Sequence, residues 1–158
     1  MQPYGDTLAD GTPPPPGLQF ALRSAFVDKE SVPAVLQILA EARASERSPF
    51  IAVRSLGGAV SRVPDDATGY AHRQAELMVV TTSAGPKPAV EAARPALEAI
   101  WERLTPHVNG AYANFLSSAT EEDVAEIYPT DTYQRLAAVK RQYDPGNLFA
   151  RNHNVRPQ

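Results

Sequence analysis

Proline is the residue type that most limits what this chain can fold into. Fifteen prolines and nine glycines are spread over 158 residues. Because proline fixes φ and lacks a backbone donor, and glycine favours turns, helices and strands must be short pieces joined by loops. The run Pro13–Pro16 before Gly17 favours extended polyproline II and predicts a flexible segment over residues 1–17. One domain is then expected over residues 18–158.

Size and charge exclude several classes of protein. A chain of 158 residues with 43% apolar residues can form one soluble domain with a hydrophobic core. A net charge of -3 gives no reason to expect nucleic acid or an acidic membrane surface as a partner. No run approaches the roughly 18 apolar residues that span a bilayer, and the N-terminus lacks the pattern of a secretion signal. The absence of cysteine excludes disulfides and thiolate metal sites and fits a cytoplasmic location.

The apolar pattern predicts an alternation of strands and helices. Strands are expected over residues 18–27, 50–56, 77–82 and 111–117. Helices are expected over 32–46, about 90–104 and 131–143, with a short helical turn after 120. Ser31, Thr120 with Asp123, and Asp131 with Gln134 are the expected helix starts. Glycine-rich loops between several strands favour an α+β fold, an antiparallel sheet with helices packed on one side, over a parallel sheet.

The sequence Asp144-Pro145-Gly146-Asn147 predicts a tight turn that ends the last helix. Proline sets φ at the second turn position, glycine accepts positive φ, and the Asp and Asn side chains bond to nearby backbone. Leu148 and Phe149 follow this turn and are expected to be buried under the preceding helix. Deletion of residues 147–158 should then destabilise the fold. The role predicted for this turn is structural.

Polar side chains alternate along the segment Gly110–Phe115. In a strand, Tyr112 and Asn114 would leave the same face, because side chains alternate with a period of two. One interpretation is an ordinary strand whose polar face meets solvent. The other is a functional face that carries a phenol and an amide. The residues alone leave both interpretations open.

A polar loop runs from Gly57-Gly58 to Tyr70-Ala-His72-Arg73. Its simplest interpretation is a surface loop between two strands in which Arg73 pairs with Asp65 or Asp66. Metal binding is not expected, because the three histidines are scattered without further ligands at suitable spacing. The glycines form no dinucleotide or phosphate-loop motif, and no serine has the setting of a nucleophile elbow.

The last thirty-one residues resemble a known family in order and spacing. The matching pieces are Arg135-Leu136, Lys140, Tyr143-Asp144-Pro145, Asn147-Leu148-Phe149 and the closing Asn154-Val-Arg-Pro157. With Gly110–Phe115 they resemble the C-terminal end of the berberine bridge enzyme-like FAD-linked oxidases of the vanillyl-alcohol oxidase superfamily, most clearly over about residues 110–157. Two features depart from the family pattern: Pro129-Thr130 stands where a glycine is usual, and His153 where a glutamine is common.

This resemblance implies a substrate-side domain, an antiparallel sheet backed by helices, from an FAD-dependent oxidoreductase. Such an enzyme would oxidise an alcohol or sugar-like substrate by hydride transfer to FAD. Carried over by position, Tyr112 is the catalytic candidate, and Tyr112, Asn114, Asn152 and Asn154 are the cofactor-binding candidates. The family holds FAD mainly in an N-terminal domain that this sequence lacks, so the chain is expected to be inactive alone. The expected partner is an FAD-binding domain or subunit, or a second copy through an exposed sheet.

The loop before Arg73 also resembles the family, which implies substrate-binding roles for Arg62, His72 and Arg73. Relatives that use a carboxylate base carry it ten residues before the histidine. Arg62 stands there and cannot act as a base at neutral pH, although it could bind an anionic substrate or favour a phenolate. Berberine-type chemistry itself is therefore not expected. The alternative function is a non-catalytic α+β binding or assembly module that retains the family fold.

Overall fold

The computed structural model describes residues 15–45 and 48–158, so most of the segment predicted to be flexible over 1–17 lies outside the described residues. Three strands are present: β1 (Gln19–Val27), β2 (Phe50–Ser55) and β3 (Leu77–Gly85). Four α-helices accompany them: α2 (Val32–Arg43), α3 (Lys87–Leu104), α4 (Glu121–Ile127) and α5 (Thr130–Tyr143). Single 3-10 turns occur at η1 (Lys29–Ser31), η2 (Val60–Arg62), η3 (Thr105–His107) and η4 (Ala113–Phe115).

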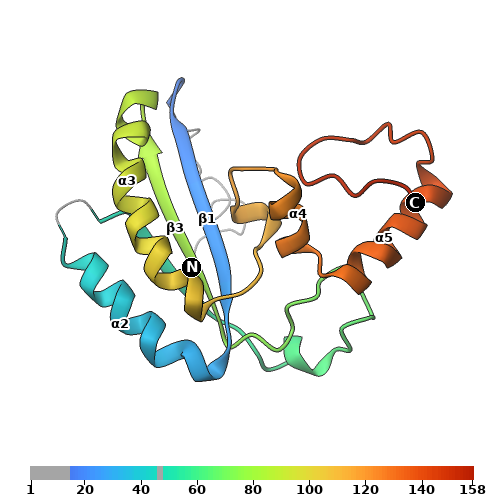
Figure 1. The fold of residues 1–158 in the computed structure, drawn as a ribbon, viewed down its shortest axis with the longest axis horizontal. Coiled ribbons are helices and arrows are strands. Elements are labelled where there is room, and N and C mark those ends of the chain that lie inside the picture. The colour runs from blue at the N-terminus through green and yellow to red at the C-terminus, as the bar shows by residue number, and fades with distance from the viewer. Residues whose placement is uncertain (1–14, 46–47) are drawn as a thin grey trace, which may run out of the picture.

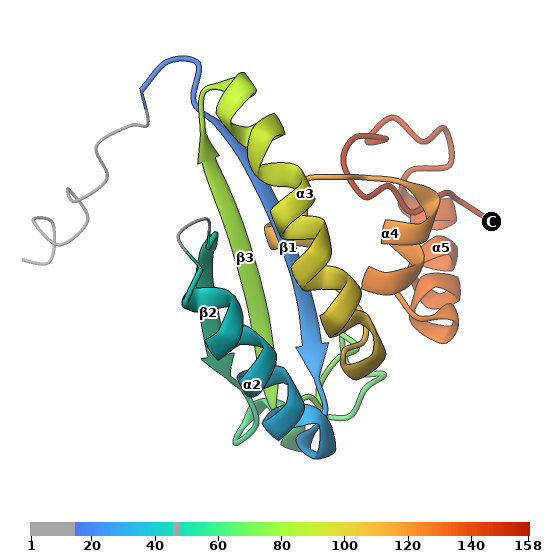
Figure 2. The same ribbon diagram turned by 60° about the vertical axis from the view of Figure 1, so that its left-hand side comes forward.

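The strands form one antiparallel sheet in the order β1-β3-β2. Helices α2 and α3 lie side by side on one face of this sheet, and α4 and α5 lie on the other side of β1 (Figures 1 and 2). The predicted α+β fold with an antiparallel sheet and helices packed on one side is therefore confirmed. No helix in the described part of the chain is long and apolar enough to cross a membrane.

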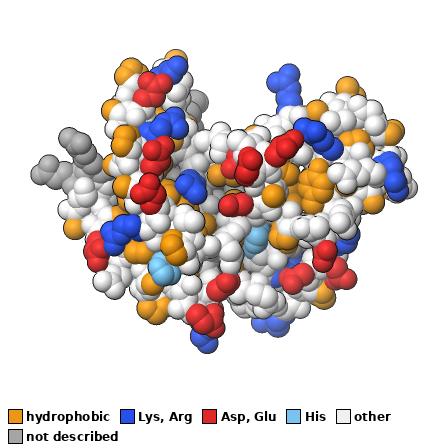
Figure 3. Space-filling model, viewed as in Figure 1, with side chains coloured by type: hydrophobic (Ala, Val, Ile, Leu, Met, Phe, Trp, Pro, Cys, Tyr) orange, Lys and Arg blue, Asp and Glu red, His pale blue; other side chains and the backbone are white. Residues whose placement is uncertain are grey.

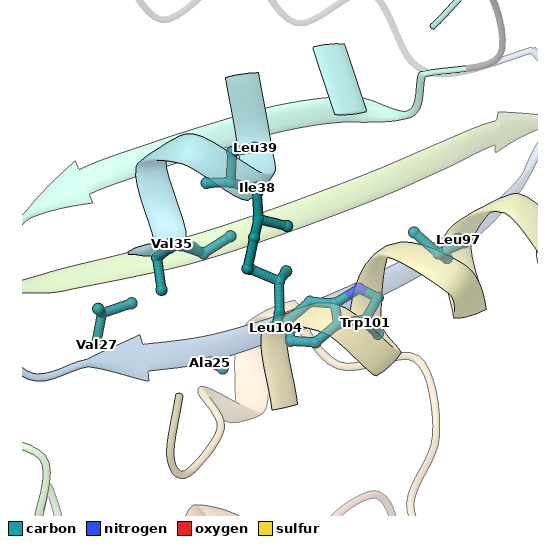
Figure 4. Close-up of a cluster of buried hydrophobic side chains, with 9 residues drawn as sticks. Ala25, Val27, Val35, Ile38, Leu39, Leu97, Trp101 and Leu104 are labelled. Atoms are coloured by element: carbon teal, nitrogen blue, oxygen red, sulfur yellow. The ribbon is translucent and has the colours of Figure 1, made fainter. Parts of the chain in front are cut away.

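The main core lies between the sheet and helices α2 and α3 (Figure 4). It is formed by buried apolar residues, namely Ala25, Val27, Val35, Ile38, Leu39, Val79, Leu97, Trp101 and Leu104. Trp101 is 2% exposed, and its Nε1 donates a hydrogen bond of 2.9 Å to Thr81 Oγ1. This bond satisfies two buried polar groups that would otherwise oppose burial of the indole.

A second, smaller core covers part of the opposite face of the sheet. Phe26, Ala75, Met78 and Val80 are buried there. The partly buried Ala52, Leu56, Tyr70, Tyr112 and Phe115 pack against them. Toward the far end of this face the cover is incomplete, because Phe20 and Phe50 remain 45% and 70% exposed. The sheet is thus closed on the helix side and open at one end of the other side.

The strand predicted over residues 111–117 is absent. Asn109 forms an isolated bridge to β1 through hydrogen bonds of 2.8 and 2.9 Å with the backbone of Phe26, and Ser117 N donates to the carbonyl of Leu22 at 3.0 Å. Gly110 then adopts φ +54°, which interrupts the extended backbone beside β1. Residues 113–115 form the turn η4 instead of continuing a ladder. The alternation of apolar and polar residues predicts a strand here, but the backbone of residues 113–115 is a turn and cannot form a ladder with β1.

The predicted burial of Leu148 and Phe149 is wrong. Their side chains are 81% and 77% exposed. The turn itself is present, but Asp144 accepts hydrogen bonds from the backbone N–H groups of both residues, at 2.7 and 3.1 Å. These bonds fix the main chain toward the turn, and the apolar side chains project into solvent.

Two of the three predicted helix starts, Ser31 and Thr120, are at the N-cap positions of α2 and α4, and only Thr120 forms side-chain capping bonds. Thr120 and Asp123 form a reciprocal capping box, with Asp123 N donating to Thr120 Oγ1 and Thr120 N donating to Asp123 Oδ2. Ser31 precedes α2 but its side chain makes no capping bond, because η1 leads directly into the helix. Helix α5 begins at Thr130 after Pro129, so Asp131 lies inside the first turn and is not the cap.

Candidate functional site

Tyr112 is held against the sheet through its backbone. Its N–H donates to Ser24 Oγ at 3.0 Å, and Ser24 Oγ donates to its carbonyl oxygen at 3.3 Å. Ser24 lies in β1 and is 2% exposed. A serine side chain thus replaces the strand pairing that the sequence predicted. It fixes Tyr112 beside the incompletely covered face of the sheet.

The two candidates Tyr112 and Asn114 are joined directly. Asn114 Nδ2 donates to the phenol oxygen of Tyr112 at 2.9 Å. Tyr112 is half-buried and Asn114 is exposed. The turn η4, rather than the alternation of a strand, brings them together. The strand face predicted for the pair is absent, and their roles in a site stay predictions.

Arg54 is a neighbour of this pair that the sequence analysis missed. Its guanidinium carbon lies 5.0 Å from the ring centroid of Phe115, and that ring packs against Tyr112 with centroids 5.5 Å apart. Arg54 faces Met78 across the β2–β3 ladder and so lies on the sheet face that carries Tyr112. Alternation within Phe50–Ser55 could have suggested its side of the strand. The sheet register that places it near Phe115 could not be inferred.

Three surface cavities contain the predicted cofactor residues, and one of them, of about 290 Å³, is lined by Tyr112. A cavity of about 410 Å³ is lined by Asn114 and Asn152, with Ser117, Ser118 and Arg151. A cavity of about 640 Å³ is lined by Asn152 and Asn154 between α4, α5 and the C-terminal tail. Figure 3 shows the surface hollowed between the side formed by α3 and β1 and the C-terminal part. The structure therefore brings the four predicted cofactor residues into adjoining sites.

Asn152 and Asn154 are held by the tail itself. Asn152 adopts φ +58°, a left-handed conformation that Asn tolerates better than most residues. Asn154 N donates to the carbonyl of Asn152 at 3.0 Å. The side-chain oxygen of Asn154 is buried and has no hydrogen-bond partner among the described residues. An acceptor in this state fits a donor group supplied from outside the chain.

His72 is packed as a neutral ring. Its imidazole stacks on Phe26 with centroids 4.3 Å apart and an interplanar angle of 15°, and Nε2 lies 3.2 Å from the carbonyl oxygen of Ile127. Burial lowers the pKa of His72, and the carbonyls of Ile127 and Glu126 oppose that shift. The ring also lines a cavity of about 290 Å³ together with Tyr70 and Tyr112. His72 is thus near the candidate pair, but its ring nitrogen is engaged with α4.

Tyr70 completes this aromatic group. Its ring lies edge-on to Phe26 at 6.0 Å and to His72 at 6.4 Å. Burial raises the pKa of Tyr70, while the nearby charge of Arg73 acts in the opposite direction. The phenol therefore remains protonated and can act as a hydrogen-bond donor toward the cavity that it shares with Tyr112.

Arg73 is buried inside its own loop. Nη1 donates to the carbonyl of Val60 at 3.3 Å, Nη2 donates to Thr68 Oγ1 at 2.6 Å, and the guanidinium lies over the ring of Tyr70. The expected pairing of Arg73 with Asp65 or Asp66 is wrong, since the cation bonds to neutral oxygens instead.

Arg62 lies apart from the candidate pair. It is exposed at the end of η2, and neither Arg62 nor Arg73 lines any of the three cavities. Their substrate-binding roles stay predictions. Over residues 15–45 and 48–158, no three side chains of His, Asp or Glu gather as a possible metal site.

Residues 111–156 match the protein family described as berberine and berberine like. Over this part the chain is similar to berberine bridge enzyme-like proteins. The resemblance predicted from its sequence is confirmed. The (R)-6-hydroxynicotine oxidase of Paenarthrobacter nicotinovorans is 55% identical over 42 residues, which are 27% of this chain and 9% of that protein. The FAD-linked oxidoreductase YvdP of Bacillus subtilis is 28% identical over 133 residues, 84% of this chain and 29% of that protein.

Solved structures extend the similarity to nearly all of the fold. A xylooligosaccharide oxidase from Myceliophthora thermophila, solved with xylobiose, superposes with a TM-score of 0.71 at 26% identity, covering 89% of this chain and 33% of that one. Berberine bridge enzyme from Eschscholzia californica gives 0.67 at 22% identity over 89% of this chain and 33% of its own, which shows a shared fold. The chain spans about a third of the length of these solved relatives.

Proposed function

We propose that this chain is the substrate-side portion of an FAD-dependent oxidoreductase. It would contribute flavin-facing and substrate-pocket residues for oxidation of an alcohol or sugar-like substrate by hydride transfer to FAD. The observation that carries this proposal is the hydrogen bond from Asn114 to the phenol of Tyr112 on the open side of the sheet. Relatives whose names describe oxidation of oligosaccharides support the substrate class.

The chemistry assigned to this chain is proton transfer. FAD, when bound, accepts the hydride from the substrate carbon. As the phenolate, Tyr112 would take up the hydroxyl proton of the substrate and become a neutral phenol, while the C–H electron pair leaves as hydride to the flavin and a C=O bond forms. The amide N–H of Asn114 would stabilise negative charge on the phenol oxygen, and the cation of Arg54 lies over the ring of Phe115, which packs against Tyr112. Tyr112 therefore acts as the base.

The residues present fit one side of a flavin ring. Asn114 and Asn152 line one cavity and offer amide donors and acceptors, and Asn154 carries an acceptor without a partner in the described structure. These groups suit the ring oxygens and nitrogens of an isoalloxazine. They cover only one side, so most of the cofactor would be held by a flavin-binding domain or subunit, or by a second copy of this chain.

Flavin titration tests this proposal. The purified chain is titrated with FAD while flavin absorption and fluorescence are followed, alone and with a flavin-binding partner. We expect saturable quenching that is about tenfold weaker in the double variant Tyr112→Phe, Asn114→Ala, because it loses two direct contacts. Tyr143→Phe is the matched control, since Tyr143 is 77% exposed on α5. Equal titration of the double variant and the wild-type chain would reject the site.

A non-catalytic assembly module is the second candidate function. It is favoured by the exposed Arg62 at the position where some relatives carry a carboxylate base. It is also favoured by the exposed aromatic side chains Phe20 and Phe50 on the sheet. The two candidates give different titrations. A module shows no flavin response alone and leaves the response of a flavin-binding partner unchanged, whereas the substrate-side portion alters the response of that partner.

A further inference from the structure

Asn109 and Gly110 form the one Asn-Gly pair in the sequence. In such a pair the glycine nitrogen can attack the side-chain carbonyl of the asparagine, because the glycine has no side chain to hinder the approach. The other asparagines precede larger residues, namely Phe115, Leu148, His153 and Val155. Asn109 is therefore the asparagine whose sequence setting most favours loss of its amide.

The structure leaves this pair open to reaction. The Asn109 side chain is exposed. The backbone N–H of Gly110 donates no hydrogen bond to any described residue, so its nitrogen is not held away from the asparagine. The ring of His72 occupies the place of a Cβ atom on Gly110, which has φ +54°. The packing therefore requires the same glycine that makes its neighbour reactive.

Asn109 is held to β1 at few points. Phe26 N donates to its carbonyl oxygen at 2.8 Å, and its own N–H donates to the carbonyl of Phe26 at 2.9 Å. Its side-chain Nδ2 donates to Asp28 Oδ2 at 2.7 Å. The backbone pair is an isolated bridge between β1 and the segment that runs on to α4 (Figure 1). It can open without disrupting the ladder of the sheet, and opening frees the dihedrals of Asn109 that the attack requires.

We propose that Asn109 is a site of deamidation, and that its conversion releases from β1 the start of the segment that carries Tyr112. The Gly110 nitrogen forms a bond to Cγ of Asn109, and the C–N bond of the side-chain amide breaks. The proton of the Gly110 N–H leaves with the amide nitrogen as ammonia. Water then opens the cyclic succinimide at either carbonyl and gives aspartate or isoaspartate. The reaction needs no oxidant, reductant or cofactor, and the product carries a new negative charge.

Either product places a carboxylate where the amide of Asn109 bonds to Asp28. A hydrogen bond of 2.7 Å is then replaced by repulsion between two like charges. Isoaspartate also adds a methylene group to the main chain, between the bridge to Phe26 and the contact of Gly110 with His72. Both changes weaken the bridge to β1.

Tyr112 lies a short distance beyond the bridge. Ala111 N donates to the carbonyl of Glu126 at 3.2 Å, and Tyr112 N donates to Ser24 Oγ at 3.0 Å. Loss of the bridge lengthens the chain that is free to move before these bonds. The bond of Tyr112 to Ser24 should then open more often. This inference concerns the chain alone and does not depend on flavin binding.

The first experiment follows the purified full chain by peptide mass spectrometry during incubation in mildly alkaline buffer. Replacement of the amide by a carboxylate raises the mass of the peptide that contains residues 109–110, and fragmentation distinguishes isoaspartate from aspartate. Asn109→Gln is the control, because the longer side chain forms the cyclic intermediate far more slowly. Asp28→Ala removes the acceptor of Nδ2, and Asp131→Ala removes an exposed carboxylate on α5 as its matched control.

We expect Asn109 to convert before every other asparagine of the chain. Asp28→Ala should convert about threefold to tenfold faster than wild type, because the bridge opens more easily without the side-chain bond. Asp131→Ala should convert at the wild-type rate. An intact Asn109 at the time when the same chain unfolded in urea has converted at this position overturns the proposal. Equal rates in Asp28→Ala and wild type also overturn it, because release from β1 would then not admit the attack.

The second experiment measures the structural consequence with Asn109→Asp, which has the aspartate product from the start. Amide hydrogen exchange is recorded by NMR, and Gln142→Glu adds the same charge at an exposed position of α5 as the control. We expect the amides of Phe26 and position 109 to exchange about tenfold faster than in wild type, and that of Tyr112 to exchange faster by a smaller factor.

The amide of Val79, inside the β1–β3 ladder, is the internal reference and should exchange as in wild type. Unchanged exchange at Phe26 and position 109 would overturn the claim that conversion releases the segment. An equal increase at Val79 would overturn it as well, since the whole fold rather than this segment would then be loosened.

Discussion

The imidazole of His72 occupies the space where a Cβ atom on Gly110 would lie. A side chain at position 110 would overlap the ring, with Cε1, Nδ1 and Nε2 all closer than any real Cβ contact. The ring cannot move away easily, because it is stacked on Phe26 and bonded to the carbonyl of Ile127. This contact fixes the start of the segment that carries Tyr112. A glycine is therefore required here for space as well as for its φ of +54°.

Gly110→Ala should destabilise the fold by about 2–4 kcal/mol, because it adds steric overlap to the cost of a left-handed backbone. Gly58→Ala is a matched control. Gly58 has φ +57°, close to that of Gly110, and nothing lies within 4 Å of its Cβ position. We expect about 1–2 kcal/mol for it, the backbone cost alone. Urea denaturation of both variants measures the difference, and equal losses would show that the ring yields without cost.

The buried ring of His72 predicts a dependence of stability on pH. Burial lowers its pKa in the folded chain, with the charges of Asp28 and Asp65 and the carbonyls of Ile127 and Glu126 opposing the shift. Because the unfolded chain has an ordinary histidine pKa of about 6.5, it binds the proton first as pH falls. The stabilising contribution of neutral His72 is thus complete above that pH and is lost below it.

The measurement is the free energy of unfolding of wild type and of His72→Phe from about pH 7.5 to about pH 5, the range in which a histidine side chain titrates. Phenylalanine retains the stacked ring but cannot titrate. We expect the wild-type value to fall more steeply with decreasing pH than that of the variant. Parallel curves would mean that His72 does not bind its proton differently in the folded and unfolded chains.

The sequence predicts the elements better than their contacts. The strands 18–27, 50–56 and 77–82 and both large helices are recovered within a few residues, because each has a continuous apolar pattern. The strand predicted over 111–117 is absent because the hydroxyl of Ser24, far away in the sequence, forms a hydrogen bond with the backbone N–H of Tyr112 that a strand partner would otherwise form. The predicted burial of residues 148–149 is wrong because Asp144 orders their backbone without burying their side chains.

The same reasoning applies to the candidate site. Tyr112 and Asn114 could be selected through the family resemblance and the alternation of their segment. Arg54 could not, because its position depends on the register between β2 and β3. The predicted pairing of Arg73 with an acidic residue rests on closeness in the sequence alone. The loop instead turns so that the oxygens of Val60 and Thr68 accept hydrogen bonds from Arg73. Long-range register and loop closure are set by tertiary contacts that one sequence does not reveal.

The capping box of α4 should contribute measurably to the free energy of unfolding. Thr120→Ala removes a hydrogen bond of 3.2 Å to Asp123 N at the start of a helix of only seven residues. We expect a loss of about 1 kcal/mol in the free energy of unfolding. Ser31→Ala is the control, since Ser31 makes no side-chain capping bond to α2 and should change stability by less than about 0.5 kcal/mol. Similar losses in the two variants would argue against the capping bond.

Ser24 couples the fold to the candidate site. Its hydroxyl exchanges two hydrogen bonds with the backbone of Tyr112 and is buried between β1 and that segment. Ser24→Ala leaves both backbone groups of Tyr112 without this partner and should cost about 1–3 kcal/mol. It should also weaken the flavin response, because the phenol is no longer held beside the sheet. Ser55→Ala, at an exposed position of β2, serves as the control.

The two readouts separate a structural role of Ser24 from a positioning role. If Ser24→Ala lowers stability but leaves flavin titration at low temperature equal to wild type, the serine supports only the fold. If it lowers both, while Ser55→Ala lowers neither, the bond between Ser24 and Tyr112 sets the position of the phenol. We expect the second outcome, because Tyr112 has no other backbone pairing to the sheet than these two bonds among the described residues.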